Sequence, residues 1–435
     1  MEAKLLSGFR DHLPQRMNLR QRILKRVKEV YESFGFVPLE TPALEYSSVL
    51  LGKYGDEWTK QLYRFKDNGG RDVALRYDLT VPLSRVVSMY NDLPRPFKRY
   101  QIGPVWRAEK AQKGRFREFY QCDVDIVGSD SYLADAECVQ IAYELITKVF
   151  GSSDFKIRIN NRKILNGLSE FAGYDKKKNI AVFRAIDKLA KIGEEGVRKE
   201  LKEAELSEDS VNKIFDFMGN IDGTNQEIIS NLKRIFFEVP TAFEGAENLE
   251  KVFQTLDLLG VPEKNLVIDL TIARGLDYYT GIVYETFLDE RPNLGSMMSG
   301  GRFDELIGQL SGKDVPAVGI SMGLDRLVAA IEDLGLAKDN SYATAQVLIT
   351  TMSDESKAPQ VATALRREGI KTELFLGKGD LRKQFKYANS TGVPFVIIIG
   401  EEEAKTGKVS LKSMTTGDQE VVAESELAER IKRQL

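Results

Sequence analysis

The sequence predicts a soluble, multidomain α+β protein in which a strand-rich antiparallel part comes first, a helical segment interrupts it, and an α/β domain follows. Three observations lead to this fold class. Residues 97–127 read as one long hairpin, residues 166–260 have helical periodicity, and strands alternate with helices after residue 345. A chain of 435 residues is also too long for one ordinary core, so two or three domains are expected.

The hairpin reads FKRYQIGPVWRAEKAQKGRFREFYQCDVDIV. Strand-type residues run up to Arg107, a basic turn ends in glycine, and the returning segment alternates aromatic or apolar with polar residues. Five side chains could converge on its inward face: Arg107, Glu109, Arg117, Gln121 and Asp125. The pattern leaves two interpretations open, a solvated salt-bridged hairpin and a binding site.

The composition excludes several classes of function. A net charge of −3 argues against a generally basic nucleic-acid binder, so a polyanionic partner would need a local patch. Cys122, Cys138 and the single His12 are too few for a disulfide framework, a serine–histidine triad or a histidine-ligated metal. No stretch approaches the roughly 20 apolar residues of a membrane span, and the opening lacks a signal peptide's apolar core. The cytosol is therefore the expected compartment.

The N-terminal part predicts a helix from about Gln15 to Phe34, followed by an extended run that contains Pro38 and Pro42. Proline places this run at a sheet edge or at an oligomer contact. A hairpin through the DNGG turn then leads to a helix near Thr80. Asp78, where strand gives way to helix, either holds a ligand amine together with Thr80 or simply caps the helix.

Two further strings carry chemistry. ARGLDYYTG predicts a strand bearing Arg274, Asp277, Tyr278 and Tyr279, and GISMGLDRL predicts a small-residue strand that feeds a helix with Arg326. Between them, the glycine pair in SGGRFDEL allows close approach of the backbone. Neither a P-loop nor a G-x-G-x-x-G motif is present. Separate arginines in strand-rich surroundings would suit a nucleoside triphosphate held without a P-loop.

After the polar linker AKDNSYATA, strands and helices alternate over about 95 residues, which predicts an α/β domain with its own sheet. A modest basic face is expected on it, from Lys371, Lys378, Arg382, Lys383 and Lys386. That face would serve either RNA binding or solubility. The helical segment at 166–260 is likewise either a clamp on a large substrate or a structural insertion.

Taken in order, the strings LRYDLT, GRFREFYQCDVDI, RGLDYYTG, SGGRFDEL and GISMGLDRL resemble the histidyl-tRNA synthetase family of class II, over essentially the whole chain. The YDLT form resembles the archaeal and eukaryotic branch. The resemblance implies a six-stranded antiparallel sheet flanked by helices in a catalytic domain at 1–336, with a helical insertion at about 166–260. It further implies an anticodon-binding domain at 345–435, and a homodimer formed through the segment around Pro42.

The resemblance implies a histidine–tRNA ligase that forms histidyl-adenylate and pyrophosphate from histidine and ATP and then charges the 3′ end of tRNA(His). Mg²⁺ would bind largely through the ATP phosphates, with no metal site in the protein. The positions matching histidine contacts are Asp78, Thr80, Arg107, Gln121, Asp125, Arg274, Tyr278 and Tyr279. Those matching ATP contacts are Arg107, Glu109, Arg115 and Arg326, and Arg107 and Arg274 would be the catalytic cations. The loop with Lys110, Gln112 and Lys113 would meet the tRNA acceptor end.

Two alternatives remain at this stage. One is a catalytically silent relative, such as the synthetase-like regulatory subunit of the first enzyme of histidine biosynthesis. The other is an RNA-binding module in which the arginines are structural. Histidine-dependent chemistry would separate both from a ligase.

Overall fold

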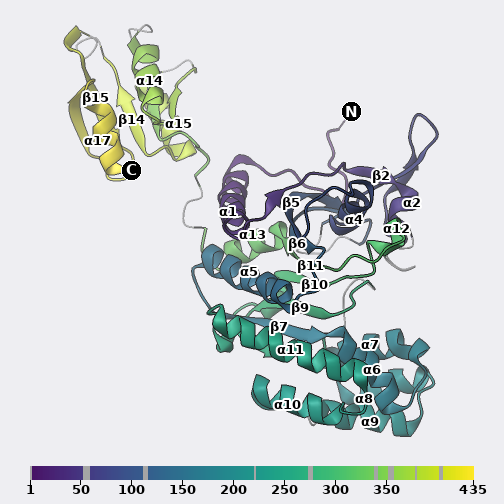
Figure 1. Ribbon diagram of the computed structural model, residues 1–435. Coiled ribbons are helices and arrows are strands. Elements are labelled where there is room, and N and C mark those ends of the chain that lie inside the picture. The colour runs from purple at the N-terminus through teal and green to yellow at the C-terminus, as the bar shows by residue number, and fades with distance from the viewer. Residues whose placement is uncertain are drawn as a thin grey trace. The chain divides into compact units, whose positions relative to one another are not determined.

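The computed structural model describes residues 2–51, 59–110, 116–219, 222–272, 278–337, 341–350, 357–377, 380–400 and 405–435. The chain divides into two compact units (Figure 1). The first comprises residues up to 10 together with 23–336, and the second comprises 11–22 together with 337–435.

The first unit is built on an eight-stranded sheet with the order β1-β5-β6-β11-β10-β9-β7-β8. In that order its strands are β1 (Val37–Pro38), β5 (Phe97–Trp106), β6 (Glu118–Val127), β11 (Ala317–Gly323), β10 (Met298–Arg302), β9 (Ile282–Leu288), β7 (Phe155–Asn161) and β8 (Leu266–Ile268). The six strands from β5 to β7 pair antiparallel, whereas β1 and β8 pair parallel at the two edges. The expected antiparallel core of six strands is therefore present, and two short parallel edge strands extend it.

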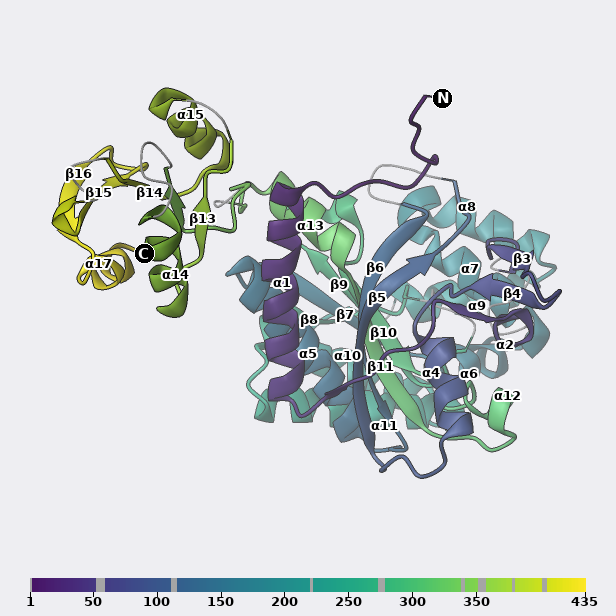
Figure 2. The same cartoon turned by 90° about the horizontal axis from the view of Figure 1, so that it is seen from above.

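Side chains alternate between the two faces of the sheet along each strand, and helices cover the face that is apolar on β6. The apolar residues Cys122 and Val124 of β6 are buried on this face, and the Tyr31 hydroxyl donates to the Cys122 carbonyl at 2.9 Å. Tyr31 belongs to α1 (Pro14–Ser33), which covers this face with α5 (Tyr132–Phe150) and α13 (Leu324–Asp333). Figure 2 shows α1 and α4 (Thr80–Met89) on opposite sides of β5 and β6. The other face of the hairpin is polar.

A three-stranded sheet lies on the polar side, with the order β2 (Leu44–Tyr46), β4 (Asp72–Leu75) and β3 (Arg64–Lys66). The short helices α2 (Ser47–Leu50) and α12 (Gly308–Ser311) adjoin this region. The DNGG hairpin is confirmed, since Asp67 Oδ1 accepts from the backbone amides of Gly69 and Arg71, both at 2.9 Å. Gly70 takes the left-handed φ of 75° that such a turn favours.

The segment from Arg162 to Leu258 is helical, as its periodicity predicts. It contains α6 (Arg162–Ala172), α7 (Asn179–Asp187), α8 (Leu189–Glu203), α9 (Glu208–Gly219), α10 (Asn225–Ile235) and α11 (Pro240–Leu258), with the short turns η1 (Lys176–Lys178) and η2 (Glu263–Asn265) beside it. Phe171, Phe217 and Phe236 form its aromatic centre, with ring centroids 5.0–6.1 Å apart. Long helix α11 packs along α5 and α6 and thereby joins the helical segment to the sheet unit.

The strand predicted through Arg274 and the two tyrosines is not formed in the described chain. β8 ends at Ile268 and β9 begins at Ile282, while residues 273–277 lie outside the described residues. Tyr278 instead packs edge-on against Tyr279 and Phe303, with centroid distances of 5.1 and 5.9 Å. Residues 278–281, the described part of this segment, are packed through these rings and enter β9 without strand pairing. A further turn, η3 (Pro292–Leu294), precedes β10.

The second unit is an α/β domain with the sheet order β13-β12-β14-β15-β16. Its strands are β12 (Val347–Ile349), β13 (Thr372–Leu374), β14 (Phe395–Ile398), β15 (Lys408–Ser413) and β16 (Gln419–Ala423). One apolar cluster packs α14 (Lys357–Arg367) and α17 (Leu427–Gln434) on one face, and a smaller cluster packs α15 (Leu381–Thr391) on the other. The expected α/β domain is confirmed, and β16 is a strand that the sequence did not predict.

Candidate active site

A row of polar side chains lies on the face of the β5–β6 hairpin that is directed away from α1. The antiparallel register pairs Arg99 with Asp125, Gln101 with Asp123, and Gly103 with Gln121. On the neighbouring strand β11, Ser321 lies opposite Asp123, and Gln121 Nε2 donates to Ser321 Oγ at 2.7 Å. Since alternate residues of a strand share a face, Gln121 and Asp125 are brought together as predicted.

This polar face is buried and acidic. Arg99 is fully buried, and its Nη2 lies 2.6 Å from Asp125 Oδ2. Burial raises the pKa of Asp125 to about 6, although the Arg99 guanidinium acts to lower it. Burial likewise raises the pKa of Asp123 to about 8, again against Arg99, and the nearby carboxylates of Asp125 and Asp78 raise it further. The face therefore favours a ligand that brings positive charge or N–H donors.

Asp78 and Thr80 lie at the start of α4, beside this face. Asp78 is buried, and its Oδ1 accepts from the backbone amides of Thr80 at 3.2 Å and Val81 at 3.0 Å. The capping interpretation is thus correct for that oxygen. Asp78 also contributes to the electrostatic environment of Asp123 and Asp125, so the segment that begins α4 belongs to the same site.

Tyr278 and Tyr279 bring aromatic surface to the site. Burial raises the pKa of the Tyr279 phenol, and the carboxylates of Asp123, Asp125 and Asp78 raise it further, which places Tyr279 beside the acidic face. Two glycines leave space for the side chains of Tyr279 and Asp125. A Cβ at Gly301 would lie 2.9 Å from Tyr279 Cδ1, and a Cβ at Gly319 would lie 2.0 Å from Asp125 Oδ1. The glycine pair in SGGRFDEL also allows close approach of backbone, because a Cβ at Gly300 would lie 2.1 Å from the Gly319 carbonyl oxygen and one at Gly301 would lie 2.5 Å from that of Ile282.

Arg107 follows the end of β5 and lies next to the segment that carries Asp78. Its Nε donates to the Tyr77 carbonyl at 3.3 Å, and its guanidinium stacks over the rings of Tyr77 and Phe119 at 4.3 and 5.0 Å. Within the described part of the chain, no acceptor contacts its two terminal nitrogens. The guanidinium thus lies over two aromatic rings, while its outer donors stay available.

The other described positions of the hairpin loop lie close to Arg107. The Glu109 carbonyl accepts from Arg117 Nε at 3.1 Å, and Lys110 is exposed. Arg117 also donates to the Ser7 carbonyl at 3.1 Å, so it ties the loop to the N-terminal segment instead of pointing into the predicted site. Gln112, Lys113, Arg115 and Arg274 lie outside the described residues.

Arg326 is on the first turn of α13, as predicted, and donates through Nη1 to the Ser296 carbonyl. Its neighbour Asp325 accepts from the Tyr120 amide at 2.9 Å and pairs with Arg10. Tyr120 precedes Gln121 in β6. The contact between Asp325 and the Tyr120 amide therefore joins α13, which carries Arg326, to β6, which carries Gln121, Asp123 and Asp125.

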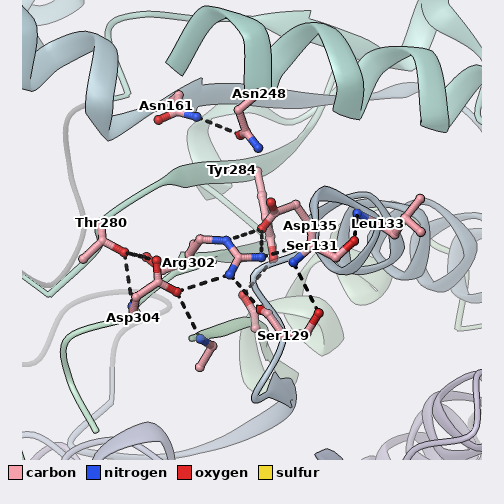
Figure 3. Close-up of polar contacts among 12 residues, drawn as sticks. Ser129, Ser131, Leu133, Asp135, Asn161, Asn248, Thr280, Tyr284, Arg302 and Asp304 are labelled. Atoms are coloured by element: carbon pink, nitrogen blue, oxygen red, sulfur yellow. Dashed lines mark hydrogen bonds and ion pairs between the residues drawn. The ribbon is translucent and has the colours of Figure 1, made fainter. Parts of the chain in front are cut away.

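A buried network around Arg302 supports the tyrosine segment (Figure 3). Arg302 pairs with Asp135 of α5 at 2.9 Å and with Asp304 at 3.2 Å, and donates to the Ser129 and Ser131 carbonyls. Thr280 Oγ1 donates to Asp304 Oδ2 at 3.0 Å, and the Thr280 amide donates to the Arg302 carbonyl at 2.8 Å. Burial raises the pKa of Asp135 to about 6, against the lowering effect of Arg302. The network anchors the residue that follows Tyr279.

The sequence reasoning missed three members of this arrangement, namely Arg99, Asp123 and Arg302. A signal for Asp123 was available, because the alternation in FYQCDVDIV puts residues 121, 123 and 125 on one face. Arg99 and Arg302 gave no local signal, since their partners come from other elements. Among the described residues, no cluster of three or more His, Cys, Asp or Glu side chains is arranged to hold a metal ion. None of the described helices is long and apolar enough to span a membrane.

The second unit has a cavity of about 1040 Å³ beside β13 and α15. Tyr342, Phe375, Leu376 and Tyr387 give it apolar and aromatic surface, and Arg366 and Lys371 add positive charge. The rings of Phe375 and Tyr387 meet edge-to-face with centroids 5.5 Å apart, and Leu376 is 91% exposed. Of the predicted basic face, Lys371 lies at this cavity.

Comparisons with known proteins agree with this geometry. The family model "Histidyl-tRNA synthetase" matches residues 8–327, and the model "Anticodon binding domain" matches residues 346–434. A histidine–tRNA ligase of Clostridium tetani is 46% identical to this chain, and the match covers 99% of this chain and 98% of the relative. A histidine–tRNA ligase of Wolinella succinogenes is also 46% identical, and the match covers 98% of this chain and 97% of the relative. The crystal structure of histidyl-tRNA synthetase from Nostoc sp. superposes with a TM-score of 0.89 at 39% identity, over the full length of both chains.

These relatives are bacterial, so they give no support to the archaeal and eukaryotic branch inferred from the YDLT string. They do account for the whole chain, including its C-terminal α/β domain. The chain belongs to the histidyl-tRNA synthetase family, the class II histidine–tRNA ligases.

Proposed function

We propose that the chain joins histidine to tRNA(His) in two steps at the polar face of β5 and β6. In the first step, the histidine carboxylate attacks the α-phosphorus of ATP, a new O–P bond forms, and pyrophosphate leaves. In the second, the 3′-terminal ribose of the tRNA takes the histidyl group and AMP leaves. The observation that carries the proposal is the convergence of Gln121, Asp125 and Tyr279 on one buried face of a chain in this family.

The histidine pocket uses that face. Asp78 and Gln121 hold the ammonium group beside Thr80, and Gln121 Oε1 is buried with no hydrogen-bond partner among the described residues. Asp125 accepts from a ring N–H of the imidazole, which lies against Tyr278 and Tyr279. A site built to hydrogen-bond such a ring rejects apolar isosteres by about 10⁴-fold, because its buried polar groups would be left unpaired.

The adenylate step needs positioning and charge neutralisation more than it needs proton transfer. Arg107 bridges the histidine carboxylate and the α-phosphate through its terminal nitrogens, and Arg274 approaches the same phosphate from the opposite side. Both act as fixed cations where negative charge develops. Glu109, Arg115 and Arg326 hold the rest of ATP. Mg²⁺ would bind largely through the ATP phosphates and would neutralise part of their charge.

The loop with Lys110, Gln112 and Lys113 meets the acceptor end of the tRNA, and the second unit binds the anticodon. Unstacked bases are commonly held on aromatic side chains, and the cavity with Phe375, Tyr387 and Lys371 offers such surface with positive charge. The catalytic domain spans 1–336 with its insertion at about 166–260, and the anticodon-binding domain spans 345–435. The proposed location is the cytoplasm.

A homodimer is proposed through the segment around Pro42. Exposed apolar side chains gather in the strands beside it: Val37, Leu44, Tyr46 and Phe65 are 44–56% exposed. Clustered apolar exposure of this kind marks interaction surfaces. Sedimentation equilibrium should give twice the mass of 49.0 kDa, and Leu44→Lys should shift the particle toward the monomer.

Amino-acid-dependent exchange of pyrophosphate into ATP tests the proposal directly. The purified chain is assayed with each of the twenty amino acids and without tRNA. Exchange with histidine alone is expected. A folded chain that binds ATP or RNA but exchanges with no amino acid would instead be a silent relative or an RNA-binding module.

Gly319→Ala should abolish most histidine-dependent exchange. The new Cβ would lie 2.0 Å from Asp125 Oδ1 and 2.7 Å from the Val124 carbonyl, so the imidazole partner must move. A displacement of about 1 Å at such a site costs about 10²-fold in rate. Gly219→Ala on α9 is the control, because a Cβ there meets nothing within 4 Å. Equal activity of the two variants would remove Asp125 from the pocket.

Binding of tRNA(His) should weaken steeply with salt despite the net charge of −3, because phosphate contacts release counterions. We expect the affinity to fall at least about tenfold between 50 and 200 mM salt, as measured by filter binding. An affinity that stays flat over this range would contradict the proposed tRNA contacts.

A further inference from the structure

Arg99 joins the two sides of the proposed histidine pocket. It lies on β5 directly opposite Asp125 of β6 and is fully buried. A single nitrogen, Nη2, lies 2.6 Å from Asp125 Oδ2 and donates to the Leu79 carbonyl at 3.1 Å. Leu79 is the residue between Asp78 and Thr80. One guanidinium therefore contacts both the imidazole side and the ammonium side of the pocket.

The contacts of Arg99 differ from those of a structural arginine. In the same unit, buried Arg302 uses all three of its nitrogens, with acceptors on Asp135, Asp304, Ser129 and Ser131. Arg99 Nε and Nη1 are buried and have no hydrogen-bond partner among the described residues. A protein tolerates such costly donors chiefly at functional sites, where local rules give way to the requirements of the site.

Three buried carboxyl groups surround Arg99. Asp123 and Asp125, both on the same face, are 2% and 3% exposed, and Asp78 is 2% exposed. Asp123 Oδ1 also has no hydrogen-bond partner among the described residues. Buried Arg76 adds positive charge near Asp123, but the cation in contact with Asp125 is Arg99, which therefore decides which oxygen of Asp125 stays available. Oδ2 faces Arg99, and Oδ1 lies over the Cα of Gly319, where a Cβ would be only 2.0 Å away.

We propose that Arg99 is a positioning residue of the histidine pocket: it fixes the carboxylate of Asp125 for the imidazole and holds the Leu79 backbone so that Asp78 meets the ammonium group. This inference rests on the proposed function. Arg99 has no proposed contact with ATP. The loss of Arg99 should therefore weaken the binding of histidine and leave the binding of ATP unchanged.

The first test is Arg99→Lys, which keeps the charge but replaces the planar fork with a single ammonium. In ATP–pyrophosphate exchange we expect the KM for histidine to rise by about 10²-fold while the KM for ATP changes less than about twofold. Isothermal titration with histidine alone should show the same loss of affinity. Arg85→Lys is the matched control, since Arg85 makes a largely buried pair with Glu45 at 2.7 Å outside this face.

A second variant covers the case in which the first does not fold. Arg99→Leu combined with Asp123→Asn removes the buried cation together with one titratable carboxyl of the same face, so fewer buried acids are left without their cation. This double variant should fold, and its KM for histidine should still be raised.

Three outcomes would overturn the inference: an unchanged KM for histidine in the folded Arg99 variants, an equal rise in the two KM values, or an equal effect of Arg85→Lys. Failure of the proposed function is distinguishable, because the unaltered chain would then show no histidine-dependent exchange at all.

Discussion

Arg107→Ala should lower the turnover number of histidine-dependent ATP–pyrophosphate exchange by about 10²–10³-fold, the range found when one fixed donor to a developing charge is removed. The guanidinium lies over the rings of Tyr77 and Phe119, and its Nε donates to the Tyr77 carbonyl at 3.3 Å. Its outer nitrogens remain to bridge carboxylate and phosphate. Because this contact forms chiefly in the transition state, the loss should fall on turnover more than on either KM.

The matched control is Arg71→Ala. Arg71 is an exposed arginine whose ion pair with Asp67 lies in a surface turn, so its removal should leave exchange unchanged. Arg107→Lys should recover only part of the activity, because a lysine cannot present two donors in one plane. The secondary structure of all three variants should match the parent by circular dichroism. Near-normal turnover of Arg107→Ala would take Arg107 off the list of catalytic residues.

Local patterns were sufficient to predict most of the fold. The alternation of apolar and polar residues in 97–127 predicted the β5–β6 hairpin. The change to helical periodicity predicted the segment that contains α6 to α11. The additions that were not predicted depend on distant partners. β1 is only Val37–Pro38 and exists as a strand because it pairs with Arg99 and Tyr100. β16 buries only Val422 of its five residues, so its apolar pattern is weak.

A site residue was predictable where a local sequence pattern marks it. It was not predictable where its role depends on a partner in a distant element. Gln121 and Asp125 share a strand face by simple alternation, and Asp78 lies at a helix start that the sequence already marked. Arg302 and Asp135 are separated by 167 residues, and no periodicity links them. At Tyr278 and Tyr279, the described part of ARGLDYYTG that carries the rings, the predicted strand was wrong, because aromatic residues favour strands when only local propensity is considered. Here ring packing and the Thr280–Asp304 contact decide its conformation.

Arg302→Met should lower the free energy of unfolding of the first unit by about 3–5 kcal/mol, the usual cost of removing one partner of a buried ion pair. Arg302 and Asp135 are 6% and 1% exposed, and the guanidinium also satisfies the carbonyls of Ser129 and Ser131. The only tryptophans are at positions 58 and 106, so urea unfolding followed by tryptophan fluorescence reports on this unit. The penalty should be larger at pH 8 than at pH 5.5. Asp135 already has a pKa raised to about 6, and without its cation it can take up a proton at the lower pH.

Arg291→Met provides the comparison within the same unit. Its ion pair with Asp333 is about half exposed, at 41% and 52%, so its loss should cost at most about 1 kcal/mol. Because Asp304 holds Thr280 next to Tyr279, folded Arg302→Met should also show a raised KM for histidine, whereas Arg291→Met should not. An Arg302 variant as stable as the Arg291 variant, with an unchanged KM, would mean that packing around Phe303 alone holds the tyrosines in place. In that case the buried charges would contribute neither stability nor position.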